Sequence, residues 1–476
     1  MLAFLVLAGL ATASGWSSRG TVQQPLNHSR HDSETFAQRF LVNDTFRAGA
    51  SAPVFLMVGG ENDIETWASI LGGQVFDLAQ QFGASVVALE HRGFGMSTLV
   101  GDSLADLSAL SVGQAVRDVF SFYDQAVGHL GLAPRDAPWV AFGCSYSGLV
   151  AAFAAQPEGG GRGGVGRASP LAGVVASSAP LRAQTRFDNY TNALMLAMAD
   201  PAAGGSARCG AAVQASLAAG AALVAEGTRG WEELAAGWGF CSAPTSLIDA
   251  QWAWRFVTEY TLGFQFVQES RGGIISYACA KALGAGPAAL APVAAILNVS
   301  SQGQCVDAAP LADFVRELRN TTVAPSESAR QYTWLKCTEL GWFHTCDAPD
   351  GCTAAGAAPA AGGGPLPLSL FQTLCMDALG IGPGAQAAAG AALNERFGGT
   401  APPGREDGRV QYVTGDADPW RFLGADPQAS FSPPVVRVEG GWHCSDMDPL
   451  SPYTPAPVRA ARASVRASVA RFLSSP

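Results

Sequence analysis

The sequence predicts an α/β fold that is interrupted by a large helical insertion. Residues 53–58 and 85–90 are short, nearly continuous apolar runs, as expected for strands buried on both faces of a parallel sheet. Residues 107–130 carry a helical pattern, and residues 139–142 form another apolar run that leads directly into Gly143. Strands and helices therefore alternate along the first third of the chain, which is typical of an α/β sheet.

One more strand is expected at residues 172–179, and the strand pattern then stops. The next two hundred or so residues are rich in Ala, Leu and Trp with helix-like spacing. Strands return at residues 410–414 and 435–438, and a helix over residues 457–473 closes the chain. We therefore expect four segments: a signal peptide (1–14), the first part of the α/β core (15–180), a helical cap insertion (181–394) and the second part of the core (395–476).

The composition is that of a folded protein with a large core. Of its 476 residues, 48% are hydrophobic and only 14% are charged. Twenty-nine basic and 39 acidic side chains give a net charge of -10, and no dense block of Lys and Arg is present. A nucleic-acid partner is therefore not expected.

Two features predict passage through the secretory pathway. Residues 1–13 form a short apolar run that ends in the small-x-small pattern cleaved by signal peptidase. This run is too short to cross a bilayer, and no other stretch reaches the roughly 20 residues of a membrane helix. Five Asn-x-Ser/Thr sequons fit a glycoprotein of the lysosome, vacuole or extracellular space: Asn27, Asn43, Asn189, Asn298 and Asn320.

The cysteines also indicate an oxidising compartment. Eight of the ten fall in one central stretch and predict a disulfide-stapled segment: Cys209, Cys241, Cys279, Cys305, Cys337, Cys346, Cys352 and Cys375. No Cys-x-x-Cys pair occurs and the His residues are scattered, so no metal site is expected. Cys144 and Cys444 lie outside the stretch, and we interpret each as a buried free thiol.

The first candidate catalytic motif is residues 143–148, Gly-Cys-Ser-Tyr-Ser-Gly, which follow an expected strand and begin an expected helix. This is the pattern of the nucleophile elbow of α/β-hydrolases, in which a strained turn exposes the serine hydroxyl. Small residues are needed two positions to either side, because bulky ones would collide with the strand or the helix. Ser145 is therefore the candidate nucleophile, with Ser147 in the place of the usual second Gly.

An acid and a base follow the two returning strands. Residues 415–420 read Gly-Asp-Ala-Asp-Pro-Trp, and residues 439–446 read Glu-Gly-Gly-Trp-His-Cys-Ser-Asp. The order Ser, Asp, His is that of the α/β-hydrolase triad, so His443 is the candidate base and Asp418 the acid that orients it. Asp416 is the main rival of Asp418, and Asp446 and Asp448 are poorer ones.

These motifs resemble those of the prolyl-specific serine carboxypeptidase family, which groups lysosomal Pro-X carboxypeptidase, dipeptidyl peptidase II and thymus-specific serine protease. The likeness covers nearly the whole chain, and the forms Gly59-Gly60-Glu61 and His443-Cys-Ser-Asp-Met447 are most similar to the thymus-specific branch. Further matching pieces are residues 24–28, 90–92, 143–146, 177–180, 337–339 and 418–420. Departures from the family pattern, which leave the triad intact, lie at residues 93–94, 147, 414 and 421–422.

The resemblance implies an α/β-hydrolase fold with a helical, disulfide-stapled cap. It implies a serine exopeptidase, of carboxypeptidase or dipeptidyl peptidase type, that cleaves short peptides after proline through an acyl-enzyme and needs no cofactor. The amide of Tyr146 and a second amide from the loop of Gly60 and Glu61 would form the oxyanion hole. Trp420 would either form a wall of the proline pocket or only pack in the core. Glu61 would either bind the amino group of a substrate or cap a loop.

The resemblance also implies a disulfide pairing. It joins Cys209 to Cys279, Cys241 to Cys305 and Cys337 to Cys375, which leaves Cys346 to pair locally with Cys352. A homodimer is left open. Two other classes of protein fit the elbow and the triad: an esterase or lipase, although no His-Gly-Gly-Gly run is present, and an inactive hydrolase fold that serves as a binding protein.

Overall fold

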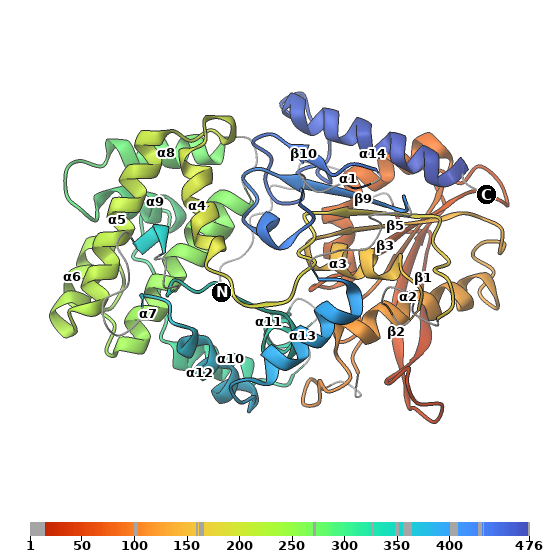
Figure 1. The fold of residues 1–476 in the computed structure, drawn as a ribbon, viewed down its shortest axis with the longest axis horizontal. Coiled ribbons are helices and arrows are strands. Elements are labelled where there is room, and N and C mark those ends of the chain that lie inside the picture. The colour runs from red at the N-terminus through yellow and green to blue at the C-terminus, as the bar shows by residue number, and fades with distance from the viewer. Residues whose placement is uncertain are drawn as a thin grey trace.

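A mixed eight-stranded sheet forms the centre of the computed structural model (Figure 1). The strand order is β1-β2-β4-β3-β5-β6-β9-β10; β1 and β2 pair antiparallel, β2 pairs antiparallel with β4, and all the other pairs are parallel. The strands are β1 (Ser18–Pro25), β2 (Thr35–Asn43), β3 (Val54–Val58), β4 (Ser85–Leu89), β5 (Trp139–Cys144), β6 (Gly173–Ser177), β9 (Val410–Gly415) and β10 (Val436–Val438). The predicted α/β-hydrolase fold is confirmed, and the antiparallel pair β1–β2 is an addition that the sequence analysis did not identify.

The structure describes residues 15–99, 103–158, 160, 166–269, 273–322, 324, 327–347, 352–355, 364–399, 408–426, 431 and 433–474. The expected signal peptide, residues 1–14, lies outside this part of the chain.

Helices cover both faces of the sheet. The helices α1 (Ile64–Phe82) and α14 (Ala456–Ser474) pack on one face, and α2 (Val112–Val127) and α3 (Ser145–Ala154) pack on the other. Local sequence sets their ends: the Asp63 carboxylate accepts hydrogen bonds from the first amides of α1, and Gly83 ends that helix with φ +64°. β3, β4, β5 and β6 are buried along their whole length, as their continuous apolar runs predict.

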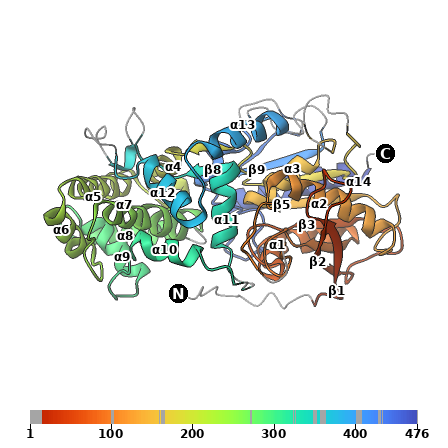
Figure 2. The same cartoon turned by 90° about the horizontal axis from the view of Figure 1, so that it is seen from below.

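Most of the remaining helices lie between β6 and β9 in sequence and gather beside the sheet, around a hydrophobic core of their own (Figures 1 and 2). They are α4 (Asn189–Ala199), η1 (Pro201–Ala203), α5 (Ala207–Ala225), α6 (Thr228–Trp238), α7 (Leu247–Arg255), η2 (Phe256–Gln268), α8 (Ile274–Gly284), α9 (Ala291–Ser300), α10 (Leu311–Leu318), α11 (Ala329–Leu335), η3 (Lys336–Leu340), η4 (Thr353–Ala355), α12 (Leu368–Leu379) and α13 (Ala385–Phe397). Two short strands, β7 (Gln184–Arg186) and β8 (Gly341–Phe343), pair within this region. The last of these helices, α13, returns to the central core, where Phe397 stacks on Phe153 of α3 at 4.3 Å.

In the described part of the chain, α5 alone has the length and apolar composition of a membrane span, and 44% of that span is buried within the protein.

Four disulfides lie within the helical insertion. They join Cys209 to Cys279, Cys241 to Cys305, Cys337 to Cys375 and Cys346 to Cys352, which are the four pairs that the family resemblance implies. Disulfides persist in oxidising compartments, so the chain is a protein of the secretory pathway.

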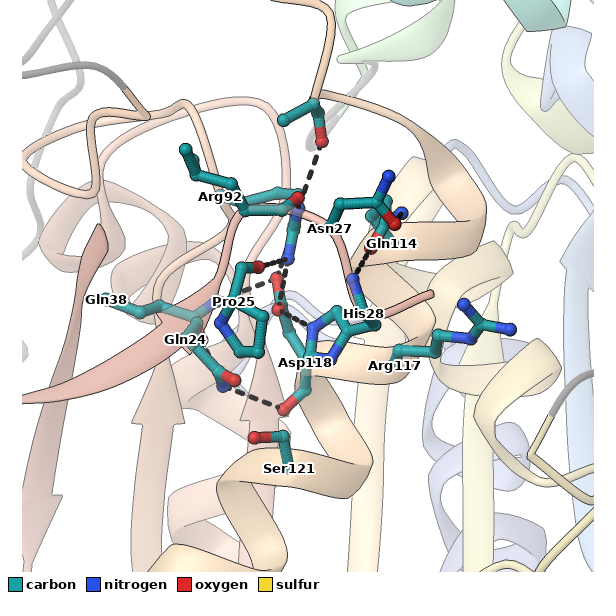
Figure 3. A network of polar contacts seen from close by, with 12 residues as sticks. Gln24, Pro25, Asn27, His28, Gln38, Arg92, Gln114, Arg117, Asp118 and Ser121 are labelled. Carbon is teal, nitrogen blue, oxygen red and sulfur yellow. Dashed lines mark hydrogen bonds and ion pairs between the residues drawn. The ribbon is translucent and has the colours of Figure 1, made fainter. Parts of the chain in front are cut away.

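A buried ion pair joins the loop that follows β4 to α2 (Figure 3). Arg92 follows β4 and is fully buried; its Nε donates to Asp118 of α2 at 2.7 Å, and its other nitrogens donate to three backbone carbonyls. His28 lies 2.7 Å from the same carboxylate. Burial alone would raise the pKa of Asp118, but the Arg92 guanidinium and these hydrogen bonds outweigh burial and hold the pKa below its ordinary value.

We expect Asp118→Asn to lower the free energy of unfolding by about 3–5 kcal/mol, because Arg92 would keep its charge in a dry site without a counter-ion. Denaturant unfolding at neutral pH measures this loss. The matched control is Asp124→Asn on the same helix, whose partner Arg167 is 43% exposed; its loss should stay below about 1 kcal/mol. Equal losses in the two variants would contradict the role given to the buried pair.

Candidate active site

The candidate nucleophile Ser145 stands at the turn between β5 and α3. Its φ angle is +57°, in the left-handed region that residues with a side chain rarely adopt. The turn requires small neighbours, because a Cβ atom on Gly143 would lie 2.3 Å from the carbonyl oxygen of Ser147. Ser145 is half-buried at the carboxyl end of a central strand, which is the geometry that exposes a nucleophile above a sheet.

Ser147 explains why this chain can depart from the usual Gly at its position. Its hydroxyl donates to the carbonyl oxygen of Cys144 at 2.9 Å and accepts from the backbone amide of the same residue at 3.0 Å. It also accepts a hydrogen bond from the indole Nε1 of Trp67, on α1, at 3.0 Å. The hydroxyl therefore closes the first turn of α3 and ties the elbow to the neighbouring helix.

The candidate base and acid are in contact. His443 Nδ1 lies 2.9 Å from Asp418 Oδ1, and the same oxygen accepts the backbone amide of Trp420 at 2.9 Å. Asp418 is fully buried. Burial opposes the charged imidazole, but the charge of Asp418 and its hydrogen bond outweigh burial and raise the pKa of His443 above its ordinary value. Nε2 of His443 remains for proton exchange with a substrate or a nucleophile.

The rival acids have other partners. Asp416 accepts from Arg437 at 2.5 Å, Asp448 accepts from the indole of Trp442 at 3.0 Å, and Asp446 accepts from the hydroxyl of Ser177. Burial raises the pKa of Asp446 to about 6. Of the four candidates, Asp418 is therefore the one that the structure brings to His443.

The expected oxyanion donors lie on neighbouring elements. Tyr146 belongs to the first turn of α3, where backbone amides have no partner within the helix. β3 pairs with β5, so the loop that follows β3 lies beside the elbow. Gly60 in this loop packs closely on Trp67, since a Cβ there would lie 2.5 Å from the indole ring. The Gly60–Glu61 loop and the first turn of α3 therefore follow neighbouring strands of the sheet.

Glu61 is the acidic group of this loop. Its Oε2 atom is inaccessible to solvent and has no hydrogen-bond partner among the described residues. Burial raises the pKa of Glu61 to about 7, although its own backbone amide and the charge of His443 both favour the ionised form. The carboxyl group therefore changes charge near neutral pH, within the electrostatic reach of His443.

Trp420 forms an apolar wall beside the acid. Its ring centroid lies 5.2–5.6 Å from four other aromatic rings and 6.3 Å from the ring of His443. The four rings are those of Phe187, Tyr190, Trp342 and His344. Trp420 is only 7% exposed, so it is both core packing and a rigid surface next to the candidate triad.

Gln268 is a site residue that the sequence analysis missed. It is the last residue of η2, and its side-chain oxygen accepts hydrogen bonds from the indole of Trp420 at 2.9 Å and from the hydroxyl of Tyr190 at 3.4 Å. Its backbone oxygen accepts the amide of His443 at 3.3 Å. An inserted helix therefore reaches the candidate triad, and no motif around Gln268 signals this contact.

The free-thiol interpretation of Cys144 and Cys444 is wrong, because the two form a disulfide. The carboxyl end of β5 and the loop after β10 meet at one edge of the sheet, so the residues next to Ser145 and His443 come together. The adjacency of each cysteine to a triad candidate was the signal that could have identified the pair. Ser178, after β6, adds a second link: its hydroxyl accepts the amide of Cys444 at 2.9 Å.

The sequons differ in exposure. Asn189, Asn298 and Asn320 are exposed and Asn27 is half-buried, so all four leave an attachment site for a glycan. Asn43 is fully buried at the end of β2, and its Nδ2 atom is inaccessible to solvent. The expectation of a glycan on Asn43 is therefore wrong for this fold, because the attachment atom faces the protein interior.

Comparisons with known proteins identify similar proteins over nearly the whole chain. Residues 24–465 match the family described as Serine carboxypeptidase S28. Thymus-specific serine protease of Mus musculus is 30% identical over 458 residues, covering 93% of this chain and 85% of that protein. The Homo sapiens protein of the same name is 30% identical over 463 residues, covering 95% and 85%. Lysosomal Pro-X carboxypeptidase of Homo sapiens is 32% identical over 139 residues, 28% of this chain and 27% of that protein.

We expect Asp418→Asn to lower kcat by about 10³–10⁴, because the amide would not stabilise a protonated His443. A general base acts in its neutral form, so activity is lost as the pH falls through the pKa of His443. Asp418 raises this pKa, and its removal should move the acidic limb of the kcat/KM profile to lower pH.

The control for this experiment is Asp416→Asn, which removes only the partner of the exposed Arg437. Its kcat should stay within about twofold of the parent and its pH profile should not move. A larger loss in the Asp416 variant than in the Asp418 variant would reverse the assignment of the acid.

Proposed function

The chain belongs to the serine carboxypeptidase S28 family and is a serine peptidase, and we propose that it removes residues from the ends of short peptides by cleavage after proline. The observation that carries the proposal is the buried Asp418–His443 pair, which stands at the same edge of the sheet as the strained turn of Ser145. An esterase would share these groups, but the family contains peptidases.

The proposed reaction proceeds through an acyl-enzyme. Ser145 Oγ attacks the scissile carbonyl carbon while His443 Nε2 takes its proton, and the Asp418 carboxylate stabilises the resulting imidazolium. The amides of Tyr146 and of the Gly60–Glu61 loop hold the oxyanion, and each such donor typically contributes about 3–4 kcal/mol to the transition state. His443 then protonates the leaving amine. In the second half of the reaction, His443 takes a proton from the water that attacks the ester carbonyl and returns that proton to the Ser145 oxygen as the peptide acid leaves.

The preference for proline is supported by the apolar wall of Trp420 and by the name of the Pro-X carboxypeptidase relative. A rigid aromatic surface beside the acyl carbon suits a ring that is itself rigid, because little side-chain freedom is lost on binding. The inserted helices favour short substrates, since η2 contacts the loop of His443. We propose the lysosome or the extracellular space as the final compartment.

The first test is Ser145→Ala, which removes one oxygen atom from the elbow. We expect turnover of proline-containing peptides to fall about a millionfold and labelling by a fluorophosphonate to disappear, while the thermal unfolding midpoint is unchanged. Residual activity within tenfold of the parent, in a sample free of contaminating peptidase, would refute Ser145 as the nucleophile.

A second test asks whether Glu61 binds the substrate's amino terminus. An ionised carboxylate attracts an ammonium group, so KM for substrates with a free amino terminus should fall as the pH rises through about 7, the pKa of Glu61. Glu61→Gln should raise this KM about tenfold at about pH 7.5, where much of the substrate's amino group (pKa about 7.7–8) is still protonated, and should remove the fall in KM around pH 7, with no change for N-acylated substrates. Glu65→Gln, at a carboxylate that is 48% exposed, is the matched control. An equal effect on free and acylated substrates would show that Glu61 does not bind the amine.

A further inference from the structure

The fifth disulfide joins the two loops that carry the candidate nucleophile and base. Cys144 directly precedes Ser145 and Cys444 directly follows His443, and the Cα atoms of the two cysteines are 5.9 Å apart across 300 residues of sequence. A ring nitrogen of His443 and both sulfur atoms lie within 4.8 Å of one another. The disulfide therefore lies against the imidazole that must exchange a proton with Ser145.

Both loops are held in backbone conformations that a free chain would avoid. Ser145 and Cys444 have φ angles of +57° and +55°, and Ser178, which accepts the amide of Cys444, has φ +49°. A non-glycine residue in this region typically costs about 1–3 kcal/mol and persists only where the surroundings impose it. A covalent link between the elbow and the His443 loop is one such imposed constraint.

The other contacts of His443 run to different elements. Its ring contacts Asp418, in the loop after β9, and its backbone amide donates to Gln268 of η2. The first contact sets the orientation of the ring and the second holds the backbone of the loop against η2. Neither partner belongs to the elbow. The Cys144–Cys444 bond connects the His443 loop to the elbow directly.

We propose that the Cys144–Cys444 disulfide is a positioning element that sets His443 against Ser145, and that its removal slows the chemical step while the protein still folds. This inference rests on the proposed function, because it concerns the rate of the same serine chemistry. A displacement of about 1 Å between reacting groups costs on the order of 100-fold in rate. Binding of the peptide, which uses the walls of the site, should change little.

The bond is also protected from reduction. Cys144 is 2% exposed and Cys444 6% exposed, whereas Cys241 and Cys305 are both exposed, in loops of the helical insertion. A small dithiol that opens a disulfide supplies two electrons and two protons, leaves two protein thiols and becomes a cyclic disulfide itself. The exposed pair should therefore open first, and the buried pair only under stronger reduction.

The experiment compares two double variants of the full chain, Cys144→Ala/Cys444→Ala and the control Cys241→Ala/Cys305→Ala. We expect the first to lower kcat and the rate of phosphonylation by a fluorophosphonate about 10- to 100-fold, with KM within twofold and complete labelling at long times. The control should lower the thermal midpoint but keep kcat. A purely structural role for Cys144–Cys444 would lower the midpoint and leave the phosphonylation rate of the folded protein unchanged, and this result would overturn the inference.

If the first double variant does not fold, stepwise reduction of the parent by dithiothreitol answers the same question. Alkylation and mass spectrometry identify which disulfides have opened, and activity should persist after the Cys241–Cys305 bond opens and fall as the Cys144–Cys444 bond opens. Full activity with the latter open would overturn the inference. A parent that neither cleaves peptides nor takes the label would refute the proposed function itself, and with it the role of the bond.

Discussion

The parallel pairing of β5, β6, β9 and β10 is the constraint on which the rest of the structure depends. Parallel strands end at the same edge of a sheet, so residues from three distant parts of the chain meet there. The register that pairs Val174 with Val410 closes this edge across the whole helical insertion. Without that register, Ser145, Asp418 and His443 would have no common location.

The dry surroundings of this edge determine how its charges behave. Asp418 is fully buried and keeps the pKa of His443 above its ordinary value, whereas burial is the largest cause that raises the pKa of Glu61 to about 7 and lowers the pKa of His91 to about 4. His91 is then a neutral acceptor for the hydroxyl of Tyr146, at 2.9 Å. Neighbouring groups thus differ in charge at one pH because only some of them have a charged partner in contact.

The sequence was sufficient for the features that are local or ordered along the chain. The elbow of Ser145, the sequence order of Asp418 and His443, and the buried strands all follow from short motifs and from apolar patterns. Contacts between distant segments were harder, because one sequence carries no record of spatial neighbours. Gln268 was missed for this reason. Cys144 and Cys444 were each interpreted as a free thiol, although each is next to a triad candidate. Asn43 was misjudged because a sequon does not reveal which face of a strand its asparagine occupies.

The contacts of Gln268 couple the position of η2 to the geometry of Trp420 and His443. Its side-chain oxygen contacts the indole of Trp420 and its backbone oxygen contacts the amide of His443, so η2 cannot move away without breaking both. A conformation in which η2 has moved away to admit a long chain or a folded loop would therefore lack both hydrogen bonds. In that conformation Trp420 and His443 would be held less firmly. Selectivity for small substrates would then follow from the geometry of the site itself, because the conformation that admits a large substrate is the one in which the base is held least well.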